Sequence, residues 1–301
     1  MRAFDTVVAV DWSARNAPSP ARPSADAIWA AVAREEGVET VYLRTRAAAM
    51  GWIEALARAE VEAGRRALLG FDFPLGWPRG FAVRVAGAPS ALAAWDRLAE
   101  WVEDDERNRS NRWAVAARLN DLFPGTGPFW GCPAGEAREG LAPDRAGWGG
   151  HGLPERRLCE ERVRRAQPGW KLAYTGSVGS QALLGQARLA GLRRRLPCAV
   201  WPFEDACEAP VVIAEIYPSL LGDALPGAGI RDEEQVRLTA FALRRLARDG
   251  RLLGAPPEAA PEEGWILGLG FEAALRAAAR EPERPAAAAS SQPAGDRKSV
   301  V

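Results

Sequence analysis

The chain has 301 residues, of which 48% are hydrophobic and 26% charged, a composition that supports a substantial buried core. Its 39 basic and 39 acidic side chains give a net charge of zero, which argues against a strongly basic nucleic-acid-binding protein. Four cysteines without a C-x-x-C pair, together with a single histidine, argue against a structural zinc site. There is no signal-peptide pattern and no apolar run of about 18 residues, so we expect a cytoplasmic protein that does not enter a membrane.

The first third of the chain has the pattern of an α/β fold. Continuous apolar runs of five or more residues are typical of strands that are buried on both faces of a sheet. Two such strands are predicted, at 6–10 and 66–73, and between them a hairpin at 26–34 and 39–44 and a helix at 50–64.

A long segment at about 78–210 then changes character and is rich in Gly, Pro, Trp and Arg. We interpret it as an insertion between sheet strands, with helices at 91–102, 154–166 and 180–196. After it we expect a third buried strand at 211–216, a helix at 232–249 and an amphipathic segment at 264–278. The chain is therefore predicted to be one domain over 1–280, followed by a disordered tail at 281–301 whose last six residues are what a translated sequencing adapter would encode.

Acidic side chains lie at or near the ends of the three buried strands. Asp11, Asp72 and Glu215 occur in the segments VVAVDWS, LLGFDFP and VIAEIYP. If the strands are parallel neighbours, these acids gather at the carboxyl edge of the sheet, where open α/β folds bind their ligands. Carboxylates without nearby His or Cys favour Mg²⁺ or Mn²⁺ over Zn²⁺. A single acid at a strand end is usually a cap or turn residue, but three on separate strands favour a divalent-metal site.

A glycine-rich run, Tyr174 to Gln181, precedes the predicted helix at 180–196. Backbone amides in such a run can bind an anion. The alternative is an ordinary helix start that Ser177 or Ser180 caps. Our candidate phosphate-binding residues are Ser13, Gly176, Ser177, Gly179, Ser180 and Gln181.

Five segments, AVDWSA, GFDFPLGWP, GSVGSQAL, AEIYPS and EEGWILGL, resemble the domain-of-unknown-function family 429, whose members are labelled predicted nucleases. The resemblance covers about Thr6 to Leu275. It implies a ribonuclease H-like mixed sheet of order 3-2-1-4-5, with Asp11 on the first strand, Asp72 on the fourth and Glu215 on the fifth, and with the long insertion between strands 4 and 5. It also implies a further acid on a late helix, for which we choose Asp232, with Glu263 as the alternative.

These features lead to three hypotheses. The first is a metal-dependent nuclease or phosphodiester hydrolase in which Asp11, Asp72, Glu215 and Asp232 bind one or two Mg²⁺ ions and activate water. The second is a protein that binds a nucleotide or a phosphorylated metabolite, and the third is an ATPase-like enzyme, since the implied sheet order is shared with actin-like ATPases. Some relatives also carry a molybdenum-cofactor-biosynthesis label. The neutral charge favours a small or single-stranded substrate over long duplex DNA.

Overall fold

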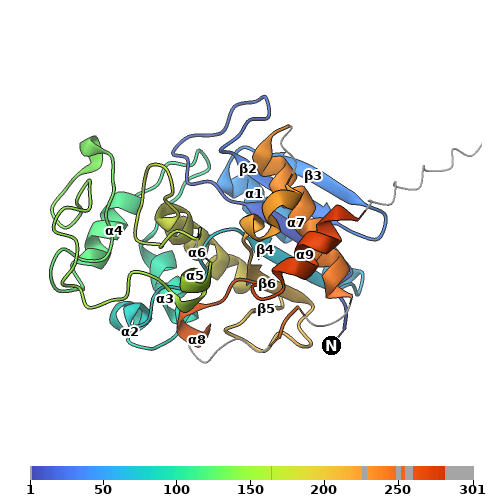
Figure 1. Ribbon diagram of the computed structural model, residues 1–301. Helices are drawn as coiled ribbons and strands as arrows, with labels where there is room; N and C mark the ends of the chain where they lie inside the picture. The colour runs from blue at the N-terminus through green and yellow to red at the C-terminus, as the bar shows by residue number, and fades with distance from the viewer. Residues whose placement is uncertain (1, 164, 226–228, 249–251, 255–259, 282–301) are drawn as a thin grey trace, which may run out of the picture.

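The computed structural model describes residues 2–163, 165–225, 229–248, 252–254 and 260–281 (Figure 1). They form a mixed sheet of six strands with the order β3-β2-β1-β4-β6-β5. The strands are β1 (Thr6–Asp11), β2 (Ile28–Ala33), β3 (Val38–Leu43), β4 (Ala67–Phe71), β5 (Cys198–Val200) and β6 (Val211–Glu215). Strand β2 is antiparallel to β1 and β3, whereas β1, β4, β6 and β5 are parallel neighbours.

The sheet differs from the predicted order 3-2-1-4-5 by one strand. Strand β5 at Cys198–Val200 lies inside the predicted insertion and pairs with β6 at the edge of the sheet, so the strand expected as the fifth is the sixth. Because β5 has only three residues, it is too short to give the apolar run that identifies the longer strands.

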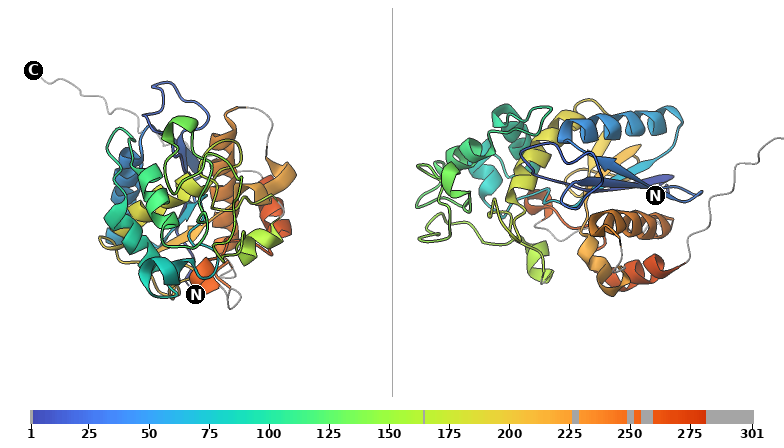
Figure 2. Two further views of the ribbon diagram at one scale, coloured as in Figure 1. Left: turned by 90° about the vertical axis from the view of Figure 1, so that its left-hand side faces the viewer. Right: turned by 90° about the horizontal axis from the view of Figure 1, so that it is seen from above.

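The helices form a layer on each side of the sheet, as Figure 2 shows. Helix α1 and the second half of α6 pack on one face with Val8, Val10 and Phe71. Helices α7 and α9 pack on the other face with Val7 and Ala9. The helices are α1 (Arg46–Glu62), α2 (Phe81–Ala86), α3 (Ala91–Trp101), α4 (Arg112–Asn120), α5 (Leu158–Arg162), α6 (Gly179–Arg193), α7 (Arg231–Ala247), α8 (Ala260–Glu263) and α9 (Glu272–Arg280), with short 3-10 turns η1 (Ala134–Glu136) and η2 (Pro218–Ala224).

The long segment between β4 and β5 has an aromatic core of its own and lies beside the sheet (Figure 1). The rings of Trp77 and Trp170 stack with their centroids 5.3 Å apart and at an angle of 20°. Phe81 and Phe129 pack around them. Helices α2 and α4 in this segment were not predicted, and the predicted helix at 154–166 is reduced to the five residues of α5. Its tryptophans are therefore needed for its own packing.

Apart from Glu281, the predicted disordered tail lies outside the described residues. Within the described ranges, no helix combines the length and the apolar character that crossing a bilayer requires.

Candidate functional site

The pairing of β1 with β4 brings Asp11 and Asp72 side by side. Val10 lies opposite Phe71 in this parallel pair. The next residue on each strand is an aspartate, and the amide of Asp72 continues the ladder by donating to the carbonyl of Val10 at 3.1 Å. Residues at the same register on adjacent strands project from the same face of a sheet. The two carboxyls therefore meet, and the amide of Trp12 donates to Oδ1 of Asp72 at 2.8 Å.

A third carboxylate, Asp232, approaches this pair from the first turn of α7. Its Oδ2 accepts a hydrogen bond from the amide of Asp26 at 2.8 Å. The charge of Asp232 raises the pKa of both Asp11 and Asp72, and the charge of Asp26 raises that of Asp11. Helix α7 thus brings Asp232 near the two strand-end acids.

The pKa values of the strand-end pair reflect this crowding. Burial, followed by the charge of Asp72, raises the pKa of Asp11 well above its usual range. Burial, together with the charge of Asp232, raises the pKa of Asp72 to about 7. The hydrogen-bond contact between the two carboxyls acts on them in opposite directions, since it raises the pKa of Asp11 and lowers that of Asp72. Two carboxylates this close share a proton or require a cation between them.

The three acids line a cavity of about 330 Å³ at the carboxyl edge of the sheet. Its walls come from the loop after β1, the start of α6, the residues after β6 and the start of α7. Besides Asp11, Asp72 and Asp232, the lining includes Ser13, Arg15, Asp26, Ser177, Gln181, Tyr217 and Ser219.

The first turn of α6 opens toward this cavity. Its N-cap residue, Val178, makes no side-chain capping hydrogen bond. The predicted capping role of Ser180 is not realised, because its buried hydroxyl donates to the carbonyl of Leu172 at 2.7 Å. Ser177 and Val178 line the cavity. The amide of Gly179, the first in the helix, already donates to the carbonyl of Lys171 at 2.9 Å. The amides that follow it in the first turn have no side-chain cap and carry partial positive charge, so this wall suits an anion.

The remaining candidate phosphate-binding residues have different roles. Gln181 lines the cavity and its Nε2 donates to the carbonyl of Trp12 at 2.6 Å. Gly176 lies in the turn before α6 and Gly179 is the first residue of the helix, and neither lines the cavity. A Cβ at Gly179 would lie 2.3 Å from the carbonyl oxygen of Gly169, so this position requires glycine.

Hydrogen bonds within the loop and from Arg46 hold the loop after β1 in place. The hydroxyl of Ser13 donates to the carbonyl of Asp26 at 3.1 Å. Arg46 donates through Nη1 to the carbonyl oxygens of Ser13 and Arg15, at 3.1 and 2.7 Å. The guanidinium of Arg46 is buried and pairs with Asp104 at 2.6 Å. Ser13 therefore fixes the rim of the cavity through its hydrogen bonds within the loop.

Glu215 lies apart from the other predicted site residues. It is the register partner of Phe71, one position before the level of Asp72, and so projects from the opposite face of the sheet. Arg157 holds it in a buried bidentate ion pair, with Nη2–Oε1 and Nη1–Oε2 distances of 2.7 and 2.8 Å. The amide of Leu75 also donates to Oε2 at 2.9 Å. The sequence predicted that Asp11, Asp72 and Glu215 meet at one site. The structure brings Asp11 and Asp72 together but places Glu215 elsewhere.

The alternative late acid, Glu263, is also engaged elsewhere. It is buried, and its carboxylate accepts hydrogen bonds from the amides of Arg79 and Leu158, at 3.0 and 2.8 Å. Of the two alternatives, Asp232 is the one at the cavity. Within the described residues, no group of three or more His, Cys, Asp or Glu side chains is arranged so as to enclose a metal ion.

Sequence reasoning missed Asp26, Tyr217 and Ser219 as lining residues. A signal for Asp26 existed in the predicted hairpin, because Asp11 pairs with Trp29 of β2 and Asp26 lies two residues before that strand. Tyr217 and Ser219 follow β6 directly and reach the same edge of the sheet.

Comparison of the chain with protein-family models, with curated proteins and with solved structures gave no match. The resemblance to family 429 and the ribonuclease H-like fold therefore stay predictions.

Proposed function

We propose that the chain is a metal-dependent phosphodiester hydrolase whose reaction centre is the Asp11–Asp72 pair, with Mg²⁺ or Mn²⁺ as the cofactor. The observation that carries the proposal is the contact between two carboxyls that burial and like charge make unfavourable as a pair of anions. A divalent cation relieves that cost.

The residues at the cavity fit Mg²⁺. This ion commonly takes only one or two protein carboxylates and completes its octahedron with water and substrate phosphate. Asp11 and Asp72 would supply the two carboxylates, and Asp232 contributes further negative charge from α7. When bound, the metal supplies a water of lowered pKa and neutralises charge that develops on the phosphate.

The protein groups around the cavity have distinct tasks in this proposal. The amide of Trp12 orients the carboxylate of Asp72. The amide of Asp26 orients Asp232. The first-turn amides of α6 that follow Gly179 bind a non-reacting phosphate oxygen, since the amide of Gly179 itself donates to Lys171. These groups are fixed before the substrate arrives, which favours catalysis by positioning.

The sheet topology supports the proposal that the fold is ribonuclease H-like. Leaving out the short edge strand β5, the order β3-β2-β1-β4-β6 has the connectivity 3-2-1-4-5, with only β2 antiparallel to β1. The first and fourth strands lead into Asp11 and Asp72, as the resemblance to family 429 implies.

A second candidate is a nucleotide- or phosphometabolite-binding protein, or an ATPase-like enzyme, on the same scaffold. The uncapped N-terminus of α6 favours it, because this element binds phosphate whether or not a bond is then cleaved.

The deciding experiment compares the wild type with Asp72→Asn, and with Asp96→Asn as a matched control. Asp96 is a half-exposed partner of Arg194 and lies outside the cavity. Mg²⁺ binding is measured by calorimetry, and cleavage is measured on bis(p-nitrophenyl) phosphate and on a single-stranded oligonucleotide. We expect Asp72→Asn to lose Mg²⁺ binding and to lower kcat by about 10²-fold or more, because one of the two metal ligands is removed. Asp96→Asn should behave like the wild type.

Cleavage that survives Asp72→Asn, or a wild type that binds no Mg²⁺, would contradict the hydrolase proposal. Mg²⁺-dependent hydrolysis of ATP but of neither diester would favour the ATPase-like alternative. Binding of a nucleotide without any turnover would favour the binding protein.

A further inference from the structure

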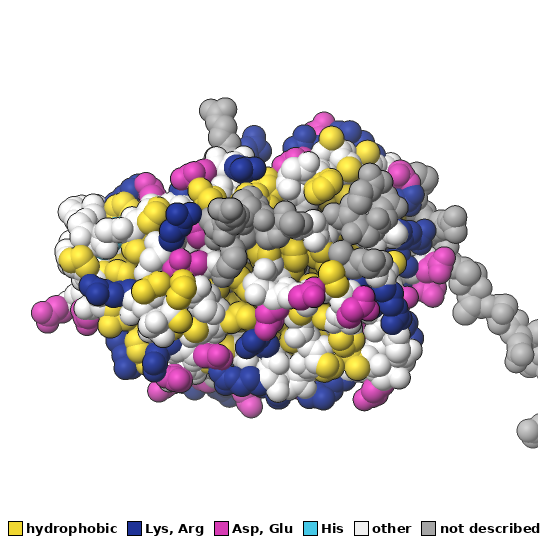
Figure 3. Space-filling view, turned by 90° about the horizontal axis from the view of Figure 1, so that it is seen from below, with side chains coloured by type: hydrophobic (Ala, Val, Ile, Leu, Met, Phe, Trp, Pro, Cys, Tyr) yellow, Lys and Arg dark blue, Asp and Glu magenta, His cyan; other side chains and the backbone are white. Residues whose placement is uncertain are grey.

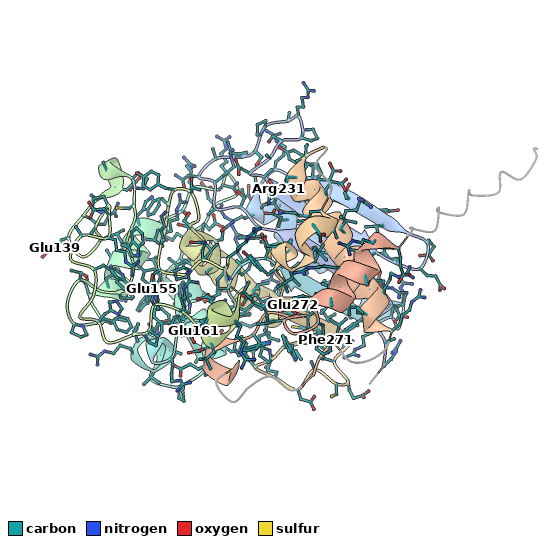
Figure 4. All side chains as sticks on the ribbon, viewed as in Figure 1. Glu139, Glu155, Glu161, Arg231, Phe271 and Glu272 are labelled. Atoms are coloured by element: carbon teal, nitrogen blue, oxygen red, sulfur yellow. The ribbon has the colours of Figure 1, made fainter. Side chains whose placement is uncertain are left out.

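A second and larger cavity, of about 990 Å³, adjoins the acidic one. The two cavities share Tyr217 and Ser219 in their linings, so they are neighbours across the turn that follows β6. The second cavity lies between α5, η2 and α9. Figure 4 labels Glu272 of α9, which lines the cavity, and Glu161 of α5, which precedes the lining residue Arg162.

Three arginines line this second cavity: Arg162, Arg165 and Arg276. Within the described part of the chain none of them has a carboxylate in ion-pair contact, in contrast to Arg34, Arg46, Arg157, Arg188 and Arg193. Arg162 lies over the ring of Trp265, at 5.3 Å from its centroid. Contacts to Trp265 and to the carbonyl of Leu220 hold Arg162 and Arg276 in place. Arginines without an acidic partner are suited to bind an anion from outside the chain.

Arg276 is the best positioned of the three. Its Nε donates to the carbonyl of Leu220 at 3.0 Å, which leaves its terminal nitrogens free of any described protein partner. The guanidinium lies against Gly222, where a Cβ would come within 3.2 Å of Nε and where φ is +57°. Glycine at 222 thus allows both the turn and the close approach of the arginine.

The two acids of the second cavity are already engaged. Asp223 pairs with Arg280 at 2.8 Å. Glu272 accepts a hydrogen bond from the amide of Gly270 at 3.0 Å. The lining therefore contains three arginines against two acids, which leaves an excess of positive charge toward a ligand.

Two exposed aromatic side chains lie next to the two cavities. Tyr174 is 62% exposed. It begins the turn that leads to Ser177 of the acidic cavity, whose amide donates to the carbonyl of Tyr174. Its φ of +70° is rare for a residue with a side chain and is typical of functional sites. Phe271 is 43% exposed and adjoins Glu272 of the second cavity (Figure 4). Among the described residues, no other aromatic side chain is as exposed as these two.

We propose that the second cavity binds the backbone of a single-stranded nucleic acid whose reacting phosphate lies at Asp11 and Asp72, an inference that rests on the proposed function. The arginines contact neighbouring phosphates, and Tyr174 and Phe271 stack on bases. Arginines with interleaved aromatic rings recognise single strands without reading their sequence. A duplex requires a broad positive surface, but acidic and basic side chains are interspersed on the face in Figure 3.

The test is equilibrium binding of a fluorescein-labelled single strand of about ten nucleotides, in EDTA to prevent cleavage. The variant replaces Arg162, Arg165 and Arg276 by Gln. The matched control makes the same change at Arg97, Arg109 and Arg194, which are surface arginines paired with acids. We expect the first variant to lose about tenfold in affinity and its salt slope to fall by about 2, since each phosphate contact in a single strand contributes about 0.7.

The same first variant should cleave bis(p-nitrophenyl) phosphate with unchanged kcat, because this small diester occupies only the acidic cavity. Tyr174→Ala and Phe271→Ala should weaken binding of the normal strand but not of an abasic strand of the same length.

Equal losses in the first variant and in the arginine control would overturn the inference, as would tighter binding of a duplex than of the single strand. Unchanged strand binding in the first variant would overturn it too, even if the diester is cleaved, and the proposed function would then survive alone. If strand binding depends on the three arginines but no Mg²⁺-dependent cleavage occurs, the second cavity is still a nucleic-acid-binding site and the hydrolase proposal is wrong.

Discussion

The Asp11–Asp72 pair should make the protein less stable as the pH rises. Both carboxyls have raised pKa values in the folded state, to about 7 for Asp72, whereas an unfolded aspartate titrates near pH 4. The folded chain therefore binds more protons than the unfolded chain between these values. The stability that this proton uptake contributes is fully present below pH of about 4 and is lost as the pH rises through the folded pKa values.

We predict that Asp72→Asn flattens this dependence, because it removes one of the two repelling charges. At pH of about 8 and without Mg²⁺, the variant should be more stable than the wild type by roughly 1–3 kcal/mol. This range allows for the water in the cavity, which screens the repulsion between the two carboxylates. Urea unfolding at intervals from pH 4 to pH 8 measures it. Asp96→Asn is the control and should keep the slope of the wild type. A wild type whose stability is constant over this window would show that the two carboxyls do not repel one another.

At the buried pair Arg157–Glu215, loss of one partner should be costly. Arg157 and Glu215 have side chains that are 1% and 5% exposed, and Arg157 also binds Glu160. Arg157→Met leaves buried carboxylates without a cation, for which we predict a cost of about 3–5 kcal/mol in the free energy of unfolding. Arg97→Met, at an exposed pair with Glu100, should cost less than about 1 kcal/mol. A similar small cost for both variants would contradict a structural role for Arg157.

Glu215→Gln separates the structural role of Glu215 from the predicted metal-binding role. Because Glu215 projects away from the cavity, Mg²⁺ affinity should be unchanged in this variant. The double variant with Arg157→Met should be more stable than the sum of the single effects predicts, since the uncompensated charge at position 215 is gone. If Glu215→Gln loses Mg²⁺ binding, Glu215 is a metal ligand as the sequence predicted.

The acids at the strand ends differ in how far the sequence could predict their contacts. Asp11 ends one buried strand and Asp72 follows another, so their meeting could be expected if the two strands were parallel neighbours, which they are. Glu215 has the same local pattern, but it is offset by one position in register and therefore faces the other way. Its partner Arg157 comes from the distant insertion, and no local pattern predicts that contact.

Among the elements, α1 and α6 contain glycines with opposite surroundings. A Cβ at Gly51 of α1 would contact nothing within 4 Å, whereas one at Gly185 of α6 would lie 2.2 Å from the ring of Phe73. Glycine inside a helix usually costs about 0.5–1 kcal/mol relative to alanine. The close packing of α6 on Phe73 should reverse that preference at Gly185.

We therefore predict that Gly51→Ala stabilises the protein by about 0.5–1 kcal/mol and that Gly185→Ala destabilises it by about 1–3 kcal/mol. The two variants make the same chemical change in helix interiors, so each is the control for the other. Urea unfolding measures both. A stabilised Gly185→Ala would mean that α6 can move away from Phe73 at little cost.

Elements differed in how well the sequence predicted them. The long strands and α1, α3, α6 and α7 have apolar patterns that local reasoning detects, with ends shifted by a few residues. Strand β5 and helices α2 and α4 were missed. Strand β5 has too few residues for a pattern, and α4 is buried by contacts on several sides, including Trp113 and Leu119, so that it lacks a single apolar face.

At the scale of the whole molecule, α6 joins the insertion to the sheet. Ala182 and Leu183 at its start belong to the aromatic core of the insertion, and Leu189 and Leu192 near its end belong to the core beside α1. The indole of Trp77 donates to the side chain of Gln186 at 2.8 Å, midway along the helix. The pair Arg157–Glu215 ties the same two regions at another point. Unfolding the insertion alone would expose part of the sheet's own core.

We therefore predict that the protein unfolds in a single cooperative step, although the insertion has its own hydrophobic core. Tryptophan fluorescence reports mainly on the insertion, where residues such as Trp77, Trp113 and Trp170 are buried, whereas far-ultraviolet circular dichroism reports on all helices and strands. The two urea transitions should coincide. In Arg157→Met they should still coincide at a lower midpoint, because α6 remains as the shared element. Separate transitions in the wild type would show that the insertion is an independent domain, and separation only in Arg157→Met would assign the coupling to the ion pair rather than to α6.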